Sequence, residues 1–267
     1  MNFKLEVYQK EFAKIAVNYG LESIDLHVFD IIDSTNRKIW SLTDLEESLP
    51  IAVIALEQTA GQGQWGRTWQ SSLGGLYLSV AISVDLALDD NFHLIMASAW
   101  GIAEMLRTYN IPVYLKWPND LILQNRKLGG IKIETRTSQE KIKYAVIGVG
   151  INWTNSVPEL GINLQSYFQK HERSITCLER LTAIVIIGIL SGYQQYLEIG
   201  SQQILANYKK ILTSVGQEVT VNNCPGIVTG VTDQGKLKVR LQSPGAYTEI
   251  CLSPGQISLG YPKLSRK

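Results

Sequence analysis

The sequence predicts an α+β fold, in which a mixed β-sheet is flanked by helices and followed by a small β-rich C-terminal domain. Apolar runs typical of strands, at 51–57 and 76–84, enclose a glycine-dense loop. Apolar residues spaced three or four apart predict a helix over 91–109. After Gly216, short alternating runs such as EVTV and LKVRL indicate a small barrel or sheet.

The first elements can be taken in order. Residues 1 to about 22 are expected to form a helix with one apolar face, made of Phe3, Val7, Phe12, Ile15 and Val17. A short strand over 27–32 follows. Residues 33–36, with the sequence DSTN, are suited to cap a helix that runs to about Glu47, and their hydroxyl and amide groups would also suit a small polar ligand.

The later elements follow the same two periodicities. The expected strands are 111–115, a hairpin of 120–124 and 129–136 that turns at Asn125-Arg126, and 144–152; the expected helices are 177–199 and 201–213. A helical turn is expected within 157–174. The domains are expected at 1–214 and 215–267. The segment 138–143 is interpreted as a solvated strand end.

Composition excludes several classes of protein. The 267 residues carry a formal net charge of +1, so the whole chain lacks the basic character of a nucleic-acid binder. Cys177, Cys224 and Cys251 form no CxxC pair, which disfavours a zinc site or a disulfide framework. The N-terminus has no secretory signal, and the longest apolar run, 183–190, is too short to span a bilayer. A cytoplasmic protein is expected.

The glycine-dense loop is the first candidate site. The stretch 57–79 reads EQTAGQGQWGRTWQSSLGGLYLS, where backbone N–H groups can approach a ligand without interference from Cβ atoms. Glycines alone would suit an ordinary long turn. Arg67, Trp65 and Trp69 change that interpretation, because a cation and flat rings suit an anion and an aromatic ligand.

A second cluster lies between residues 116 and 134. Lys116-Trp117-Pro118-Asn119-Asp120 has a constrained path because proline restricts its own φ and the preceding residue. Lys127 then stands just before Gly129 and Gly130. Two lysines, a carboxylate and a glycine-rich loop are what ATP-dependent activation of a carboxylic acid requires, because cations offset the phosphate charge and amides cradle it.

The ordered set GQGQWGRTW, KWPNDLIL, RKLGGIKIE and VIGVGIN resembles the biotin–protein ligase family. With DSTN, these motifs cover about residues 27–152. The resemblance implies a class II-synthetase-like fold, shared with lipoate ligases, and an SH3-like C-terminal barrel. It also implies a two-step reaction: biotin and MgATP give biotinoyl-5′-AMP and pyrophosphate, and a lysine of a biotin carboxyl carrier protein, the acetyl-CoA carboxylase subunit, then displaces AMP.

The resemblance also implies roles for particular residues. The catalytic residues would be Lys127, Lys116, Arg67 and Asp120, with Lys127 the strongest candidate and Asp120 orienting a lysine or supporting Mg²⁺, which is held mainly through the ATP phosphates. Biotin would contact Ser34, Thr35, Asn36, Gln58, Gly61, Gln62, Gly63, Gln64, Lys127, Gly129 and Gly130. ATP would contact Arg67, Trp69, Lys116, Asn119 and Asn152. Trp69 and Trp117 could equally be core aromatics, Asp120 only an ion-pair partner, and Asn152 a turn cap.

Two departures from the family pattern shape the expectations. The family loop usually reads GRGRxGRxW, whereas Gln62 and Gln64 replace the first two arginines here. Glutamine has no charge and no forked guanidinium, so biotinoyl-AMP should be held more weakly, each lost contact costing roughly 1.5–3 kcal/mol if desolvated. Fewer than about thirty residues precede the strand at 27–32, so a ligase without the DNA-binding winged helix of some family members, and without repressor function, is expected.

Alternative functions remain open from the sequence. A lipoate or octanoate ligase or transferase would share the fold, and a biotin-binding module without turnover would fit the two glutamines. A transcriptional regulator is disfavoured by the missing basic face. An exposed sheet edge could dock the carrier or a second copy, so the chain could be a monomer or a homodimer.

Overall fold

A computed structural model describes residues 2–43, 49–243 and 246–261. In these residues a seven-stranded sheet has the order β1-β2-β3-β7-β6-β5-β4. β1 runs parallel to β2 and the other neighbours are antiparallel, so the sheet is mixed as predicted. Its strands are β1 (Asp25–Ile32), β2 (Ile51–Gln58), β3 (Leu76–Ala87), β4 (Tyr114–Lys116), β5 (Asp120–Leu123), β6 (Arg126–Ser138) and β7 (Lys141–Ile151).

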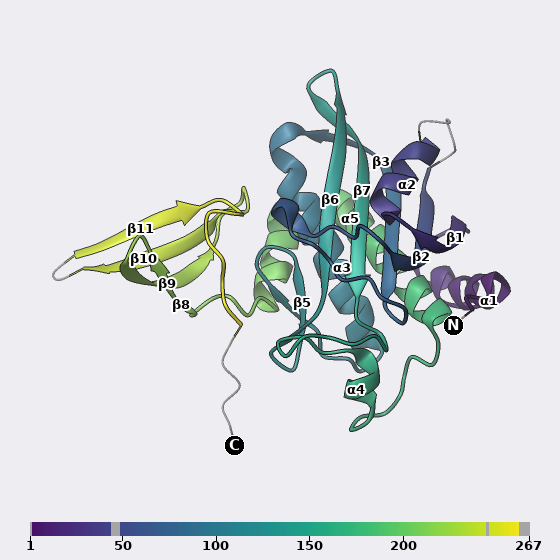
Figure 1. The fold of residues 1–267 in the computed structure, drawn as a ribbon. Coiled ribbons are helices and arrows are strands. Elements are labelled where there is room, and N and C mark those ends of the chain that lie inside the picture. The colour runs from purple at the N-terminus through teal and green to yellow at the C-terminus, as the bar shows by residue number, and fades with distance from the viewer. Residues whose placement is uncertain (1, 44–48, 244–245, 262–267) are drawn as a thin grey trace.

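The two faces of the sheet are covered by different helices (Figure 1). In β2, Ala52 and Ile54 pack into the larger core, whereas Ile51 and Val53 pack into a smaller one, as expected for a strand buried on both faces. The larger core includes residues of α1 (Leu5–Ala16), α3 (Asn91–Thr108) and α5 (Leu178–Lys210), and the smaller core lies under α2 (Thr35–Thr43). The short helices are η1 (Val17–Tyr19), η2 (Gln64–Gly66), η3 (Leu88–Asp90) and α4 (Leu164–Phe168).

The C-terminal residues form a second, four-stranded antiparallel sheet with the order β11-β10-β9-β8. Its strands are β8 (Glu218–Val221), β9 (Cys224–Val231), β10 (Leu237–Ser243) and β11 (Ala246–Leu252). This sheet stands beside the β5 end of the main sheet (Figure 1). The indole of Trp117 donates a hydrogen bond to the Gly235 carbonyl, 2.9 Å away, and so ties the two parts together. The predicted α+β fold with an added C-terminal β unit is confirmed.

Several predicted boundaries need correction. The β5–β6 hairpin turns at Gln124-Asn125, where both φ angles are positive, and not at Asn125-Arg126. The predicted strand 111–115 is only Tyr114–Lys116, because the Ile111–Val113 segment follows the end of α3 as irregular backbone. Val17 is exposed, and Tyr8 takes its place on the buried face of α1.

Other element predictions are confirmed. The break between the two C-terminal helices lies at Gly200, whose φ of +79° interrupts α5 at a position suited to glycine. Segment 138–143 contains the exposed turn between β6 and β7. The predicted end of α2 near Glu47 lies outside the described residues. Within the described residues, no helix combines the length and apolar character needed to cross a membrane.

Candidate active site

One cavity collects most of the predicted site residues. It lies between α2, the loop after β2, the strands β4 to β6, and the segment that follows β11. The predicted residues that line it are Ser34, Thr35, Asn36, Gln58, Gln62, Gly63, Gln64, Arg67, Trp69, Lys116, Asn119, Asp120, Lys127 and Gly130. The predicted residues, which lie up to about a hundred positions apart in the sequence, therefore form one site, although their roles toward a ligand stay predictions.

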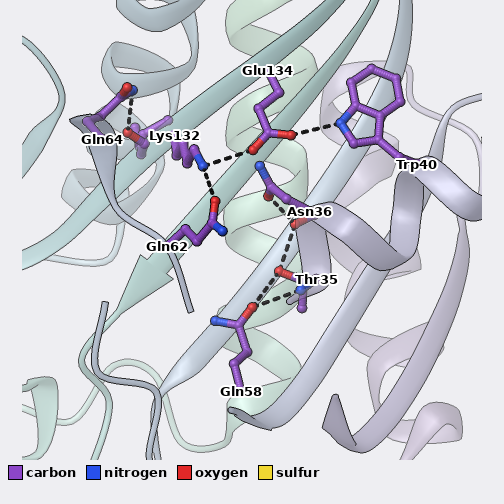
Figure 2. Close-up of polar contacts among 10 residues, drawn as sticks. Thr35, Asn36, Trp40, Gln58, Gln62, Gln64, Lys132 and Glu134 are labelled. Atoms are coloured by element: carbon purple, nitrogen blue, oxygen red, sulfur yellow. Dashed lines mark hydrogen bonds and ion pairs between the residues drawn. The ribbon is translucent and has the colours of Figure 1, made fainter. Parts of the chain in front are cut away.

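A polar group occupies the end of the cavity near α2. Gln58, at the end of β2, accepts hydrogen bonds from the Thr35 backbone N–H at 2.8 Å and from its hydroxyl at 3.1 Å. The Ser79 hydroxyl lies 2.8 Å from Thr35 Oγ1 and 2.6 Å from Asn36 Oδ1. These bonds fix the amide and hydroxyl groups at the start of α2 (Figure 2). Buried polar groups that are held in this way can recognise a polar ring in an otherwise apolar pocket.

The amide nitrogen of Asn36 is a buried donor without a hydrogen-bond partner among the described residues. It points toward the Glu134 carboxylate of β6 (Figure 2). The neighbouring β7 residue is Gly148, where a Cβ atom would lie 2.2 Å from Asn36 Oδ1. The absence of a side chain at Gly148 leaves room for Asn36. Because the Asn36 amide nitrogen has no hydrogen-bond partner among the described residues, this donor can serve a ligand.

Charged groups occupy the opposite end, on the strands β4, β5 and β6. Asp120 Oδ1 lies 2.6 Å from the Lys127 ammonium, and Asp120 Oδ2 lies 3.7 Å from the Lys116 ammonium. Lys116 and Asp120 are buried, whereas Lys127 is half-buried. The alternative that Asp120 is an ion-pair partner for the lysines agrees with these contacts.

Burial lowers the pKa of Lys116, and the positive charge of Lys127 lowers it further. The carboxylate of Asp120 acts in the opposite direction and favours the charged ammonium. The net shift is downward. A lysine in this state gains the most from an anionic ligand, because the ligand supplies the negative charge that its surroundings only partly provide.

The segment after β11 covers this charged end. The Tyr261 hydroxyl donates a hydrogen bond to Asp120 Oδ2 at 2.6 Å, and the Lys116 ammonium lies 4.0 Å from the centre of the Tyr261 ring. Burial, followed by the negative charge of Asp120, raises the pKa of Tyr261, so the phenol stays protonated and remains a donor. Gly255, Ile257, Ser258 and Leu259 also line the cavity. No sequence motif marks this segment, which lies more than a hundred residues after the other motifs.

The loop after β2 folds back on itself over the cavity. Gln62 pairs with Thr68, and the Gly63 N–H donates to the Arg67 carbonyl at 2.7 Å. Trp65 at the tip has a φ of +53°, and its indole touches Gly255 of the C-terminal segment. The loop is therefore a small hairpin whose side chains are mostly exposed.

Trp69 lies on the cavity wall and not in the core. Its ring packs on Gly150 of β7, where a Cβ atom would lie 2.5 Å from the indole, so only glycine permits this approach. The Lys127 ammonium lies 5.3 Å from the centre of the ring. The indole N–H is buried without a partner among the described residues, so it is available to a ligand. Trp117 also lines the cavity, but its side chain belongs to the core and is only 3% exposed.

The two loop glutamines contact β6 (Figure 2). The side-chain carbonyl of Gln62 accepts a hydrogen bond from the Lys132 ammonium at 2.7 Å. The side-chain amide of Gln64 donates to the backbone carbonyl of Ile131 at 3.3 Å. Asn119 donates to the same carbonyl at 2.6 Å. The glutamines thus dock the loop on the strand. Lys132 was missed by the sequence analysis, although the alternation Gly130, Lys132 along β6 could have placed it on the cavity face.

Three predicted residues lie outside the cavity lining. Gly61 packs against Ser71 and the Trp69 carbonyl, and Gly129 packs against the Gly150 carbonyl. Asn152 donates to the Lys127 carbonyl at 3.3 Å and accepts from the Asn155 side chain at 3.0 Å. These contacts hold the loop and the Lys127 backbone in place. A contact of Asn152 with nucleotide stays a prediction.

The arrangement can bind a small polar ring at one end and a phosphate chain at the other. Among the described residues there is no group of three or more His, Cys, Asp or Glu side chains that could hold a metal ion. Both oxygens of Asp120 are engaged, by Lys127 and Tyr261. The site therefore combines charge stabilisation by lysines with preformed hydrogen-bond donors, which suits group activation without a side-chain nucleophile.

Known proteins are similar to this chain in sequence and in fold. The Biotin/lipoate A/B protein ligase family model matches residues 28–152. The bifunctional ligase/repressor BirA of Salmonella typhimurium is 31% identical over 230 residues, which are 83% of this chain and 71% of the relative. The human biotin–protein ligase is 24% identical, over 89% of this chain and 34% of its own length. The biotin protein ligase of Aquifex aeolicus, solved with biotin and ATP, has a TM-score of 0.68 and 25% identity, covering 89% of this chain and 99% of that one. This chain belongs to the biotin protein ligase family.

Proposed function

We propose that this cavity carries both half-reactions of an ATP-dependent biotin–protein ligase. Family membership gives the class of enzyme, a ligase that attaches biotin to protein. The observation that carries the assignment of the site is that Asn36 offers an unpartnered buried donor at one end of the cavity, and the Lys116–Asp120–Lys127 group lies at the other.

The polar end would bind the ureido ring of biotin. The Asn36 N–H group would donate to the ureido carbonyl, and Ser34, Thr35 and Gln58 would match the remaining polar edge. A ligand without these groups would leave buried donors and acceptors unpaired, which costs about 1–3 kcal/mol for each group. This cost would select biotin against lipoate or octanoate, whose apolar chains offer no such edge.

The charged end would support formation of the adenylate. A biotin carboxylate oxygen attacks the α-phosphorus of ATP, the bond from phosphorus to the bridging oxygen breaks, and pyrophosphate leaves with the electron pair. Lys127 and Lys116 would offset the charge on the phosphate and the carboxylate, while Asp120 keeps both ammonium groups in position. Arg67 would contact phosphate, and Trp69 and Asn119 would border the nucleotide.

Mg²⁺ would enter with the triphosphate and supply further charge neutralisation there. Because Lys127 and Tyr261 engage both oxygens of Asp120, this residue fits the orientation of lysines better than direct metal binding. The metal would accordingly be held through the phosphates.

The second half-reaction would transfer biotin to a carrier lysine. The neutral amine attacks the carbonyl carbon of the mixed anhydride, the carbon–oxygen bond to AMP breaks, and AMP leaves with the electron pair as the new amide loses its proton. One relative is a biotin–[acetyl-CoA-carboxylase] ligase from Mycobacterium tuberculosis. A biotin carboxyl carrier protein is the corresponding partner for this chain. We retain the division into 1–214 and 215–267 as a proposal, with Gly255–Leu259 of the second part completing the cavity.

The test is to incubate the protein with MgATP, a carboxyl carrier domain and biotin, lipoate or octanoate, and to read carrier mass and acid-dependent pyrophosphate exchange. Of the three acids, only biotin should support the increase in carrier mass and the pyrophosphate exchange. Exchange driven by lipoate or octanoate would favour the alternative acyl substrate. Biotin binding without exchange would favour a module that binds biotin without turnover.

A further inference from the structure

The Lys132 ammonium links the loop after β2 to Glu134 on β6, and Glu134 in turn contacts α2. The Lys132 Nζ donates to the side-chain carbonyl of Gln62 in the loop at 2.7 Å and lies 3.0 Å from Glu134 Oε1 on the same strand as the lysine. The other Glu134 oxygen accepts a hydrogen bond from the Trp40 indole of α2 at 2.9 Å. Figure 2 shows this series of contacts running from the loop through β6 to α2. The same helix α2 carries Thr35 and Asn36, which form the polar end of the cavity.

These contacts differ from an ordinary pair of surface charges. The Lys132 side chain is only 21% exposed, and the residue lines the cavity. Burial acts to raise the pKa of Glu134, but the contacts with Lys132 and Trp40 outweigh this and lower the pKa. The Asn36 amide also faces the carboxylate and acts in the same direction, although it completes no hydrogen bond with it. Glu134 is therefore ionised near neutral pH and can hold the Lys132 ammonium in place.

The side chain at position 62 matches this lysine. A glutamine carbonyl accepts the hydrogen bond that the ammonium donates. An arginine at the same position would offer only donors and would place a second positive charge beside Lys132. Gln62 and Lys132 thus form a complementary pair, in which the strand carries the charge and the loop carries the acceptor.

We propose that Lys132 is a positioning residue that fastens the loop 61–69 over the activated intermediate, with Glu134 holding its ammonium and Gln62 as its contact on the loop. This role rests on the proposed function, since it concerns retention of the adenylate formed there. An unfastened loop would let biotinoyl-AMP escape before the carrier arrives. Lys132 therefore controls the fraction of activated biotin that reaches protein.

The first experiment measures how closely adenylate formation is coupled to transfer, as the ratio of pyrophosphate released to biotin transferred. In Lys132→Met, pyrophosphate released per biotin transferred should rise about three- to tenfold, as expected for loss of a partly exposed charged hydrogen bond. The rate of adenylate formation with saturating biotin should change less than the rate of adenylate loss. Lys132→Arg should largely restore coupling, because its guanidinium can donate to both Gln62 and Glu134. Lys141→Met is the matched control, since Lys141 pairs with the exposed Asp85 at the far end of the sheet.

The second experiment identifies the route. Gln62→Met should raise the same ratio, and the double variant with Lys132→Met should be no worse than either single one, because both remove the same bond. Gln62→Arg should also impair coupling in the natural background. Coupling should recover when Gln62→Arg is combined with Lys132→Met, because the guanidinium introduced at position 62 can then reach Glu134.

A third measurement needs no turnover. Hydrogen exchange of the backbone amides at 61–69 in the ligand-free protein should accelerate in Lys132→Met and in Gln62→Met but not in Lys141→Met. Unchanged exchange in the first two variants would overturn the proposal even if the protein did not activate biotin. Wild-type coupling in Lys132→Met, or better retention in Gln62→Arg alone, would overturn it with the proposed function intact. If Lys132→Met did not fold, the test would rest on Gln62→Met, because Gln62 is exposed.

Discussion

The cavity has two walls with different chemistry. The strand wall holds Lys116, Asp120 and Lys127, which are buried or half-buried and joined by ion pairs. The loop wall holds Gln62 and Gln64, which reach β6 through single hydrogen bonds to Lys132 and the Ile131 carbonyl. Charges act more strongly in the buried wall because solvent screens them less there. We therefore expect the strand wall to carry the chemistry and the loop wall to retain the intermediate.

Substitutions on the two walls should have different kinetic effects. A change on the strand wall should alter the rate at which the adenylate forms, because the interaction grows with charge in the transition state. A change on the loop wall should alter how long the adenylate stays, because exposed polar contacts contribute little to charge stabilisation.

Lys127→Ala should have the largest effect. It removes the ammonium nearest to Asp120 and leaves that carboxylate underpaired at the phosphate end of the cavity. By analogy with the loss of one preorganised donor to a developing anion, biotin-dependent pyrophosphate exchange should fall about a hundred- to a thousandfold. Lys141→Ala, at the exposed hairpin turn, should retain the wild-type rate. A wild-type rate in Lys127→Ala would show that the strand wall does not carry the charge stabilisation.

Asp120→Asn should have the next largest effect. The change keeps the size of the side chain but removes the anion that positions both lysines, so adenylation should slow about ten- to a hundredfold. Because the Asp120 carboxylate favours the charged form of Lys116, its loss lowers the pKa of Lys116 further. The ammonium would then deprotonate at lower pH.

The pH profile distinguishes this effect from general damage. If activity needs the Lys116 ammonium, the alkaline limb of kcat/KM in Asp120→Asn should move to lower pH than in the wild type. A variant that had only lost folded protein would show a reduced amplitude with an unchanged limb. An unmoved limb would therefore separate Lys116 from the chemistry.

Gln64→Arg should change retention more than chemistry. The longer side chain can still donate to the Ile131 carbonyl and adds a guanidinium at the cavity, where the family pattern places arginine. The biotinoyl-AMP complex should dissociate about three- to tenfold more slowly, as expected for one partly exposed charge-assisted contact. Adenylation should change little. Dissociation of labelled adenylate at the wild-type rate would contradict the prediction that Gln64, in place of arginine, weakens its hold.

The strand wall could be predicted from sequence, whereas much of the loop wall could not. Lys116 and Asp120 stand four residues apart around a proline, and the hairpin that follows returns Lys127 to them, so local spacing was sufficient. Gln62 meets Lys132 across seventy positions, and the two come together only because the loop after β2 folds over the cavity onto β6. The turn at Gln124-Asn125 was misplaced by one residue because neither residue is a glycine, the usual indicator of positive φ.

The segment after β11 was the largest omission. Tyr261 carries no motif, and its contact with Asp120 depends on how the C-terminal sheet packs beside β5. For Asn152, the sequence predicted the position in the fold but not the contacts of the side chain. Its position at the end of β7 was predicted correctly, but the side chain faces Lys127 O and Asn155, a choice set by packing that the strand pattern does not reveal.

Tyr261→Phe should have the smallest effect and tests whether the strand wall needs its cover. The phenylalanine ring can still lie over the Lys116 ammonium, as the tyrosine ring does at 4.0 Å, but Asp120 loses the hydroxyl donor 2.6 Å away. Asp120 keeps its contact with Lys127, so adenylation should slow by only about threefold, in keeping with one lost hydrogen bond to a charged group that retains other partners.

Tyr247→Phe is the matched control, since Tyr247 is 80% exposed on β11 and distant from the cavity lining. Tyr261→Ala removes the ring as well and should cost more than Tyr261→Phe, because the cation–π contact with Lys116 is then lost. Equal rates for the two Tyr261 variants would show that the ring contributes nothing. A wild-type rate in both would mean that the buried lysines and Asp120 hold their geometry without the C-terminal segment.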